Sequence, residues 1–488
     1  MSARHEGSMT SFAWVMRLVA TLAVPFAALS PAFAQIAVKN QGYIPYSDAP
    51  IFYRSDDIGD PVARLQKQLE QGKAQLVYDA QDHGYLKSVL KLLDIPASSQ
   101  TLVFSKTSFQ YPKISPEHPR ALYFNDDVYV GSVHEGKEIE LVSFDARQGA
   151  IFYLVHEQRV DKPVFERAEL DCTQCHIAAG TRGVPGVLLR SVQPTSTGTL
   201  VTGASTFITD QDSPLKERWG GWYVTSKLSD GTLANSAAPE GTSGKSPTLA
   251  ALEKTFEPSA YLTPGSDVVS LLVLAHQTQM HNLITLTNYK TRIALHTLAE
   301  QSAGAAGSAE NALPPPDKDA PLPEATRRQF ERPAEQLLRY LLFANETELP
   351  SLDGKQVIAS SAYAREFAAR GPRDSKGRSL RDFDLSTRIF RYPCSYLIYS
   401  DAFDALPEPS KTYVYHRLLQ ILSGQDDDPD FESLSAQDRQ AILEILLETK
   451  QGLPQEWRDY AHSHQLQVGS ALNQSGQQSP HRLSLIHI

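Results

Sequence analysis

The chain has 488 residues, of which 41% are hydrophobic and 21% charged, and its formal net charge is −10. This composition is that of a folded globular protein and not of a disordered one. An acidic chain without basic clusters lacks the Lys/Arg stripes that displace counterions, so we expect no nucleic-acid partner. Three cysteines in a chain of this length do not make a disulfide framework.

The N-terminus has the three parts of a secretory signal peptide. Arg17 precedes an apolar run over residues 18–29, and small residues follow up to Ala34. The run is shorter than the about 20 apolar residues that span a bilayer. We therefore expect residues 1–34 to be a signal peptide, with cleavage after Ala34, although a buried core helix is the alternative. No later segment is apolar enough to span, so the mature chain should be exported, periplasmic in a bacterium, and soluble.

The next region, residues 35–167, is predicted to be a mixed α/β N-terminal domain. Its helix candidates show leucines at helical spacing, and its strand candidates show β-branched and aromatic runs separated by turn residues. The strands follow one another closely enough to form a meander. The predicted helices cover residues 61–71 and 84–93, and the predicted strands cover 102–104, 121–133, 139–144 and 151–156. Turns are predicted at Asn125-Asp126 and at residues 147–149.

Residues 168–300 form a central region that is loop-rich around two cysteines. The segment 187–225, rich in Thr, Val and Gly, predicts further strands or long loops. The longest periodic segment of the chain, 266–298, predicts one helix, and a break in it would fall near Thr287.

The rest of the chain is predicted to be a linker, a helical region and a tail. Residues 301–330 contain a low-complexity Ala/Gly/Ser stretch and three consecutive prolines, which indicate a linker or a disordered insert. Residues 331–470 are expected to be mainly helical, and 471–488 to be a disordered tail. The predicted helices cover 332–345, 411–422 and 437–449, the last with Ser435 as its N-cap. Together the regions predict an α+β fold.

An acidic group, Asp426 to Asp428 with Asp430, lies between the last two predicted helices. It lacks the alternating ligand spacing and the glycine of a calcium-binding loop. We therefore interpret it as a solvated turn.

Cys172-Thr173-Gln174-Cys175-His176 has the spacing C-x-x-C-H. Two thiols separated by two residues can each add to one of the two vinyl groups of a haem, and the histidine that follows supplies an axial nitrogen to the iron. Haem is attached in this way after export, so the signal peptide and the motif support each other. The sequence therefore predicts one covalent haem c on Cys172 and Cys175, with His176 as an iron ligand.

Three other interpretations of the two cysteines remain. A structural zinc site would need two more ligands, and only Cys394 with a distant histidine could complete it. A dithiol redox site would not need His176 and is expected on a strand-to-helix turn of a thioredoxin-like unit. The third is a plain disulfide.

The wider chain resembles large exported bacterial proteins with a single-haem cytochrome c domain and no assigned activity. The resemblance rests on CTQCH, on TRGVPG and RSV after it (residues 181–186 and 190–192), on RWGGWYV (218–224) and on RYPCSYLIYS (391–400). Only CTQCH implies a chemical role. The chain is several times longer than small cytochromes c, so their compact helical fold need not apply.

Met280 is the only methionine after residue 34 and lies in HQTQMH, residues 276–281. His276 and Met280 are four residues apart and share a helix face, whereas His281 is turned away by about 100°. The sequence predicts Met280 as the distal iron ligand, with His276 and His281 as alternatives. The competing interpretation is that Met280 packs in the core and the two histidines satisfy ordinary hydrogen bonds.

Other residues are candidates for contacts at the haem edge. Arginine and indole N–H groups can hold carboxylates by hydrogen bonds, and the candidates of these types are Arg182, Arg190, Arg218, Trp219 and Trp222. Cys394 lies among Tyr392, Tyr396 and Tyr399 and is expected to be a buried free thiol in an aromatic core.

These features predict an exported mono-haem c-type cytochrome that transfers single electrons to an unidentified periplasmic partner. The alternative is a haem-dependent oxidoreductase or peroxidase with an open distal position, in which a histidine of the 276–281 segment acts in catalysis. A third hypothesis is a sensing module in which the N-terminal domain recognises a partner.

Overall fold

The computed structural model describes residues 44–81, 83–225, 255–307, 321–349 and 354–468. It is an α+β structure, as expected, with a seven-stranded antiparallel sheet in the N-terminal region and helices in the C-terminal part. The expected signal peptide and C-terminal tail lie outside the described residues. The proposed boundaries at 167/168 and 330/331 stay predictions, because all described residues group with one another in a single unit, 41–488.

The main sheet is a meander with one additional edge strand. Its strand order is β6-β5-β4-β3-β2-β1-β9, and every pairing is antiparallel. Its strands are β1 (Thr101–Val103), β2 (Arg120–Phe124), β3 (Val128–Val133), β4 (Glu138–Asp145), β5 (Gly149–His156), β6 (Glu166–Arg167) and β9 (Trp222–Tyr223). A separate pair consists of β7 (Arg190–Ser191) and β8 (Phe207–Ile208).

The two faces of the sheet belong to different apolar cores because successive side chains of a strand point to opposite faces. Leu141 and Tyr153 pack with α1 (Pro61–Glu70) and α2 (Leu86–Leu92) in one core. Tyr129, Phe144 and Phe152 point to the other face, whose core also contains the long helix α5 (Val268–Gly307). The sheet therefore has the two short N-terminal helices on one face and the first part of α5 on the other, while Leu286 and Tyr289 farther along α5 belong to the core of α1 and α2.

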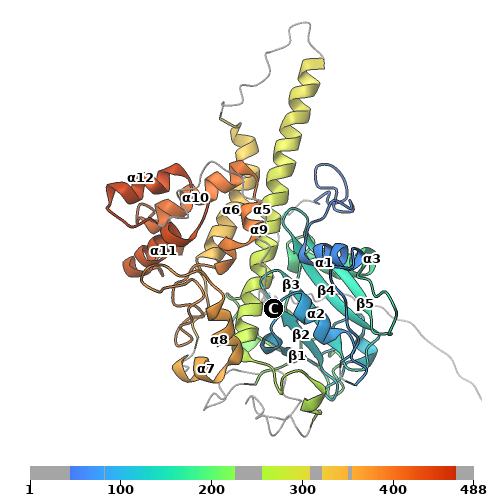
Figure 1. Cartoon of the computed structure of the whole chain (residues 1–488). Helices are drawn as coiled ribbons and strands as arrows, with labels where there is room; N and C mark the ends of the chain where they lie inside the picture. Colours follow the sequence, from blue (N-terminus) through green and yellow to red (C-terminus); the bar gives the residue numbers. More distant parts are fainter. Residues whose placement is uncertain (1–43, 82, 226–254, 308–320, 350–353, 469–488) are drawn as a thin grey trace, which may run out of the picture. The chain divides into compact units, whose positions relative to one another are not determined.

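Helix α5 connects the sheet with the C-terminal helices (Figure 1). It continues without a break through Thr287, whose hydroxyl donates to the Leu283 carbonyl at 2.8 Å within the helix. The remaining helices are α3 (Glu169–His176), α6 (Glu324–Leu341), α7 (Gly354–Ser360), α8 (Ala362–Ala369), α9 (Asp401–Asp404), α10 (Glu408–Leu422), α11 (Ala436–Thr449) and α12 (Gln455–Ser463). None of the helices in the described ranges is both long and apolar enough to cross a membrane.

Two helix boundaries near the expected linker differ from the prediction. Helix α5 continues to Gly307, and α6 begins at Glu324 and not near residue 332. Pro333 therefore lies inside α6, where it removes one helical N–H, and not at its start. Packing explains why the helix tolerates it, since Pro333 and Ala334 are buried and α6 lies along α5.

The acidic group 426–430 lies in the connection between α10 and α11, where a short 3₁₀-helix begins at Pro429, and it is held by arginines and not simply solvated. Arg339 lies 2.8 Å from Asp428 and is also paired with Asp430, and Arg417 is paired with Asp426. The expected N-cap of α11 is confirmed, because the Ser435 hydroxyl accepts a hydrogen bond from the Asp438 amide at 3.0 Å.

Candidate functional site

The C-x-x-C-H motif lies on one short helix. Helix α3 begins at Glu169 and ends at His176, directly after β6. Cys172 and Cys175 are three residues apart on it, so their side chains share one helix face. Cys175 is an exposed free thiol, and Cys172 is half-buried against the core that contains α5. The helix thus presents two thiols side by side at the edge of that core.

His176 is fixed in one orientation by its surroundings. Its Nδ1 lies 2.8 Å from the carbonyl oxygen of Gly186, and its ring packs against Phe152 of β5 with ring centroids 5.0 Å apart. A carbonyl only accepts, so Nδ1 carries the proton and Nε2 of the neutral ring carries the lone pair. Burial lowers the pKa of His176 and so favours this neutral form. Nε2 is therefore the nitrogen that could bind a metal.

The loop after the motif, residues 177–187, is attached to α5. Asn282 donates to the Val187 carbonyl at 2.7 Å and accepts from the Val187 amide at 3.1 Å. Gln279 donates to the Gly180 carbonyl at 3.0 Å. A Cβ on Gly186 would lie 2.1 Å from Asn282 Oδ1, so only glycine allows the loop to approach the helix this closely. Helix α5 thereby positions the carbonyl that orients His176.

A partly covered apolar strip of the sheet lies beside His176. Val142 is paired with Phe152 across β4 and β5, and Leu122 of β2 faces the same side of the sheet. Val142 and Leu122 are only half-buried although they pack against the core that contains α5. This strip is a surface against which a flat apolar group could pack.

An arginine reaches across the same face. The guanidinium of Arg120 passes over Gly131, where a Cβ would lie 2.2 Å from Nη2, and pairs with Glu140. Glu140 also accepts from Ser108 at 2.8 Å. The Nε of Arg120 is buried and makes no hydrogen bond. Arg120 and Glu140 lie on the same sheet face as Phe152, on which the His176 ring packs, and they respectively lower and raise the pKa of His176.

These residues fit a covalently attached haem. The two thiols on one helix face match the two vinyl groups, and the oriented imidazole matches the iron. The half-covered apolar strip matches the macrocycle, and the arginine with a buried unsatisfied N–H matches a propionate. No group of three or more potential metal ligands of the His, Cys, Asp and Glu types occurs among the described residues, which gives no support to a zinc site. The purely antiparallel sheet also differs from the thioredoxin-like unit that a dithiol site would suggest.

No family model, no curated protein and no solved structure matches this chain. Arguments about its function therefore rest on the arrangement of its own residues.

Two of the three predicted distal ligands lie in well-formed core contacts. Met280 is fully buried in the apolar core between the sheet and the C-terminal helices. His276 is also fully buried, with Nδ1 2.6 Å from Gln211 Oε1 and Nε2 2.7 Å from the Ser395 hydroxyl. Because Gln211 Oε1 accepts, Nδ1 of His276 is the donor, and the lone pair of Nε2 accepts from Ser395. Burial lowers the pKa of His276 to about 3, so its ring is neutral at pH 7.

The third candidate, His281, faces the sheet. Its ring packs on Phe144 with centroids 3.9 Å apart, and its Nδ1 lies 3.1 Å from the Tyr129 hydroxyl. Its Nε2 is buried without a hydrogen bond of ordinary geometry, and the nearby backbone of Asp126 raises its pKa against the larger effect of burial. None of the contacts described for these three side chains joins them to His176, and ligation by any of them stays a prediction.

Two of the candidates for the haem edge donate hydrogen bonds to backbone carbonyls of nearby loops. Arg218 is buried and donates to the carbonyls of Ser213 and Gln211 at 2.8 and 2.7 Å. Trp222 donates its indole N–H to the Arg190 carbonyl at 2.9 Å. These groups therefore hold the loops after the motif.

The other candidates, and Cys394, differ in their contacts and in their burial. Arg190 has an exposed side chain, and Arg182 lies 3.3 Å from Gln279 Oε1. Trp219 is fully buried, and its indole N–H makes no hydrogen bond. Cys394 is a fully buried free thiol in the aromatic core around Tyr396, as expected.

Sequence reasoning missed the residues that orient the motif. Gly186, Gln279 and Asn282 hold His176 and its loop, and Arg120 and Phe152 face it from the sheet. Gly186 belongs to the TRGVPG block that contributed to the family resemblance, so that block was a signal without an assigned role. The polar residues within the apolar periodicity of α5 were a second signal, but they suggested metal ligands and not loop contacts.

Proposed function

We propose that this chain is an exported mono-haem c-type cytochrome that carries single electrons in the periplasm. The observation that carries the proposal is the placement of Cys172, Cys175 and His176 on one short helix, with the His176 Nδ1 proton held by the Gly186 carbonyl. This arrangement supports two thioether bonds and one imidazole–iron bond to the same macrocycle.

The residues around the motif have separate roles in this proposal. Cys172 and Cys175 would hold the haem by one thioether bond each to its vinyl carbons. His176 would supply Nε2 to the iron, and its Nδ1 hydrogen bond to Gly186 increases the basicity of the ring. Phe152, Val142 and Leu122 exclude water from one side, and Arg120 offers a cation to a propionate. The bound haem supplies the one-electron ferric/ferrous couple.

Haem attachment is tested with cysteine variants of the full chain, expressed together with the cytochrome c assembly machinery. We expect the wild-type chain to retain haem after denaturing electrophoresis, as detected by haem peroxidase staining. Cys172→Ala together with Cys175→Ala should abolish the stain, whereas Cys394→Ala, which removes the third cysteine outside the motif, should retain it. A stain in the double variant, or none in the wild type, would contradict the proposal.

A specific observation favours a second function, a haem oxidoreductase with an open distal position. Met280 is packed in the core, and both ring nitrogens of His276 are engaged in hydrogen bonds. His281 is then the one remaining candidate of the three, and if it too keeps its contact with Tyr129, a bound haem would have an iron position available to a small molecule. The chain would then bind a substrate at the iron in addition to transferring electrons.

Absorption spectra of the wild type and Met280→Leu distinguish the two functions. An open position predicts that the ferrous protein binds carbon monoxide and that Met280→Leu leaves the ferric spectrum unchanged. Loss of a weak red ferric band in Met280→Leu would instead identify Met280 as a ligand and leave electron transfer as the function.

A further inference from the structure

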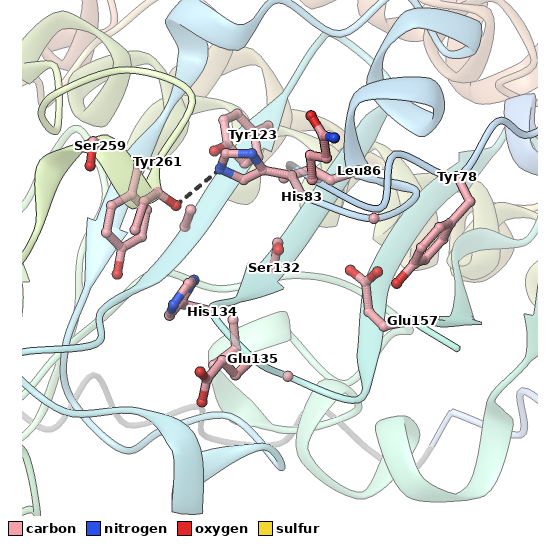
Figure 2. A pocket seen from close by; sticks show the side chains of 16 residues that line it. Tyr78, His83, Leu86, Tyr123, Ser132, His134, Glu135, Glu157, Ser259 and Tyr261 are labelled. Atoms are coloured by element: carbon pink, nitrogen blue, oxygen red, sulfur yellow. Dashed lines mark hydrogen bonds between the residues drawn. The ribbon is translucent and has the colours of Figure 1, made fainter. Parts of the chain in front are cut away.

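A cavity of about 420 Å³ (Figure 2) lies on the sheet face of Ala121 and Tyr123, which is opposite the face of Phe152 and His176. Ala121, Tyr123 and Ser132 contribute its floor from strands β2 and β3. Its walls come from the chain before α2, from the β3–β4 turn, from the end of β5 and from residues 259–261. Four separate segments therefore converge on one hollow of the size that small-molecule sites have.

The charges of the lining are one-sided. Among the described residues, Glu135, Glu157 and the two histidines His83 and His134 line the cavity, and no lysine or arginine does. Burial lowers the pKa of His83, so this ring adds no positive charge at neutral pH. The nearby Lys87 is paired with Asp79 at 3.9 Å. Within the described lining, the two carboxylates therefore face no lysine or arginine, and His134 is the second histidine beside them.

The backbone makes room for one of these carboxylates. A Cβ on Gly84 would lie 2.3 Å from Glu157 Oε2 and 3.3 Å from the ring of Tyr78, and Gly84 has a φ of +55°. Only glycine therefore allows the carboxylate and the tyrosine ring to approach this turn. His83, the preceding residue, has a φ of +66°, which is uncommon for a residue with a side chain. Its Nε2 is held 3.0 Å from the Ala260 carbonyl on the opposite wall (Figure 2).

In the part of the chain that the structure describes, no lysine or arginine pairs with Glu157 to compensate for its burial. Burial raises its pKa to about 7, and the hydrogen bond from the Tyr85 amide opposes this effect. A cationic ligand would provide the missing charge, and aromatic faces also attract cations. The lining includes the tyrosine rings of Tyr78, Tyr123 and Tyr261.

We propose that this cavity binds a small organic amine, with Glu157 as the principal carboxylate partner of its ammonium group and Glu135 as the second. The proposal is independent of the haem function, because none of its residues belongs to the cysteine motif or to the residues around His176. A metal ion is a poorer fit, since no group of three or more His, Cys, Asp and Glu side chains in the described ranges is arranged so that it could hold one.

The test is isothermal titration of the full chain with 1,4-diaminobutane at pH 8 and low salt, where Glu157 is ionised. Its neutral analogue 1,4-butanediol is the control ligand. We expect saturable binding of one diamine per chain and no binding of the diol. Absence of saturable heat with the diamine, or equal binding of the diol, would overturn the proposal.

Variants locate the site. Glu157→Gln keeps an acceptor for the Tyr85 amide but removes the charge, and it should weaken diamine binding at least tenfold. Glu432→Gln, at an exposed carboxylate outside the cavity, should leave binding unchanged. Ser259→Trp places a large side chain at the exposed wall, which makes the cavity smaller without changing a charge, and it should also weaken diamine binding. This second variant keeps the test valid if Glu157→Gln does not fold. Unchanged affinity in both cavity variants would place the diamine elsewhere and refute the proposal.

Discussion

At the scale of single residues, His176 shows how much of a site depends on contacts that the motif does not contain. The pattern C-x-x-C-H identifies the histidine, but the Gly186 carbonyl decides which ring nitrogen carries the proton. The motif could be identified in the sequence because its chemistry requires a short, fixed spacing. The residues that orient it could not be identified, because Asn282 is 95 positions from the loop residue to which it hydrogen-bonds.

Arg120 gives a prediction at this scale. Its half-buried guanidinium lies on the sheet face against which the ring of His176 packs, so it should stabilise the ferrous state relative to the more positively charged ferric state. Arg120→Gln should therefore lower the midpoint potential of the haem in a spectroelectrochemical titration. Arg327→Gln, which removes an exposed arginine of α6 paired with Glu331, is the matched control and should leave the potential unchanged. An unchanged potential in Arg120→Gln would show that Arg120 does not act on the iron.

Met280 gives a second prediction. Its complete burial predicts that Met280→Ala lowers the free energy of unfolding by about 2–5 kcal/mol, whereas Met280→Leu, which conserves volume, costs less than about 1.5 kcal/mol. Urea unfolding followed by tryptophan fluorescence measures both changes. A small effect of Met280→Ala would contradict the core role and favour the predicted role at the iron.

At the scale of elements, α5 both fills the core and holds the loop after the cysteine motif. Its apolar residues fill the core between the sheet and α6, and its polar residues Gln279 and Asn282 hold the loop that follows the motif. The helix itself was predictable from periodicity. Its extension to Gly307 was not, because the Ala/Gly/Ser composition of its last turns indicates a linker. Pro333 likewise suggested a helix start, since local preference does not include the packing of α6 on α5.

Asn282→Ala tests this attachment. The variant leaves the buried amide and carbonyl of Val187 without partners, which should lower the free energy of unfolding by about 1–3 kcal/mol. Hydrogen exchange should also increase in residues 177–187, because the loop loses its anchor. Glu300→Ala, at an exposed position of the same helix, should change stability by less than about 0.5 kcal/mol. Unchanged exchange in the loop of Asn282→Ala would show that other contacts hold it.

At the scale of the whole molecule, the α+β class and the strand meander follow from patterns that are local in sequence. Alternation within each strand and short turns between strands were sufficient to predict that β2 to β5 pair in order. The position of β9 beside β1 was not predictable, because more than one hundred residues separate the two strands. The cavity around Glu157 was not predictable for the same reason, because the four segments of its wall are distant in sequence and meet only in the folded chain.

Buried carboxylates make the stability of the whole molecule depend on pH. Burial raises the pKa of Glu346 to about 7 although the Ile389 amide donates to it at 2.7 Å. The folded state then binds this proton more tightly than the unfolded state, whose glutamate has a pKa near about 4.3. The contribution of Glu346 to stability is therefore fully present below about pH 4 and is lost as the pH rises through about 7.

Glu346→Gln removes this titration and keeps an acceptor for the Ile389 amide. The variant should gain stability relative to the wild type as the pH rises, so the difference in unfolding free energy at pH 8 should favour it more than at pH 5. Urea unfolding at both values measures the change. Glu432→Gln, at an exposed carboxylate, should show no such trend, and a parallel pH dependence of wild type and Glu346→Gln would contradict the argument.

The most direct test of the central claim is the intact mass of the purified mature chain under denaturing conditions, after expression with the cytochrome c assembly machinery. We predict the mass of the polypeptide beginning at Gln35 plus one haem, with the haem mass lost only when both Cys172 and Cys175 are replaced. A wild-type mass equal to that of the polypeptide alone would show that this chain carries no covalent haem and would contradict the account.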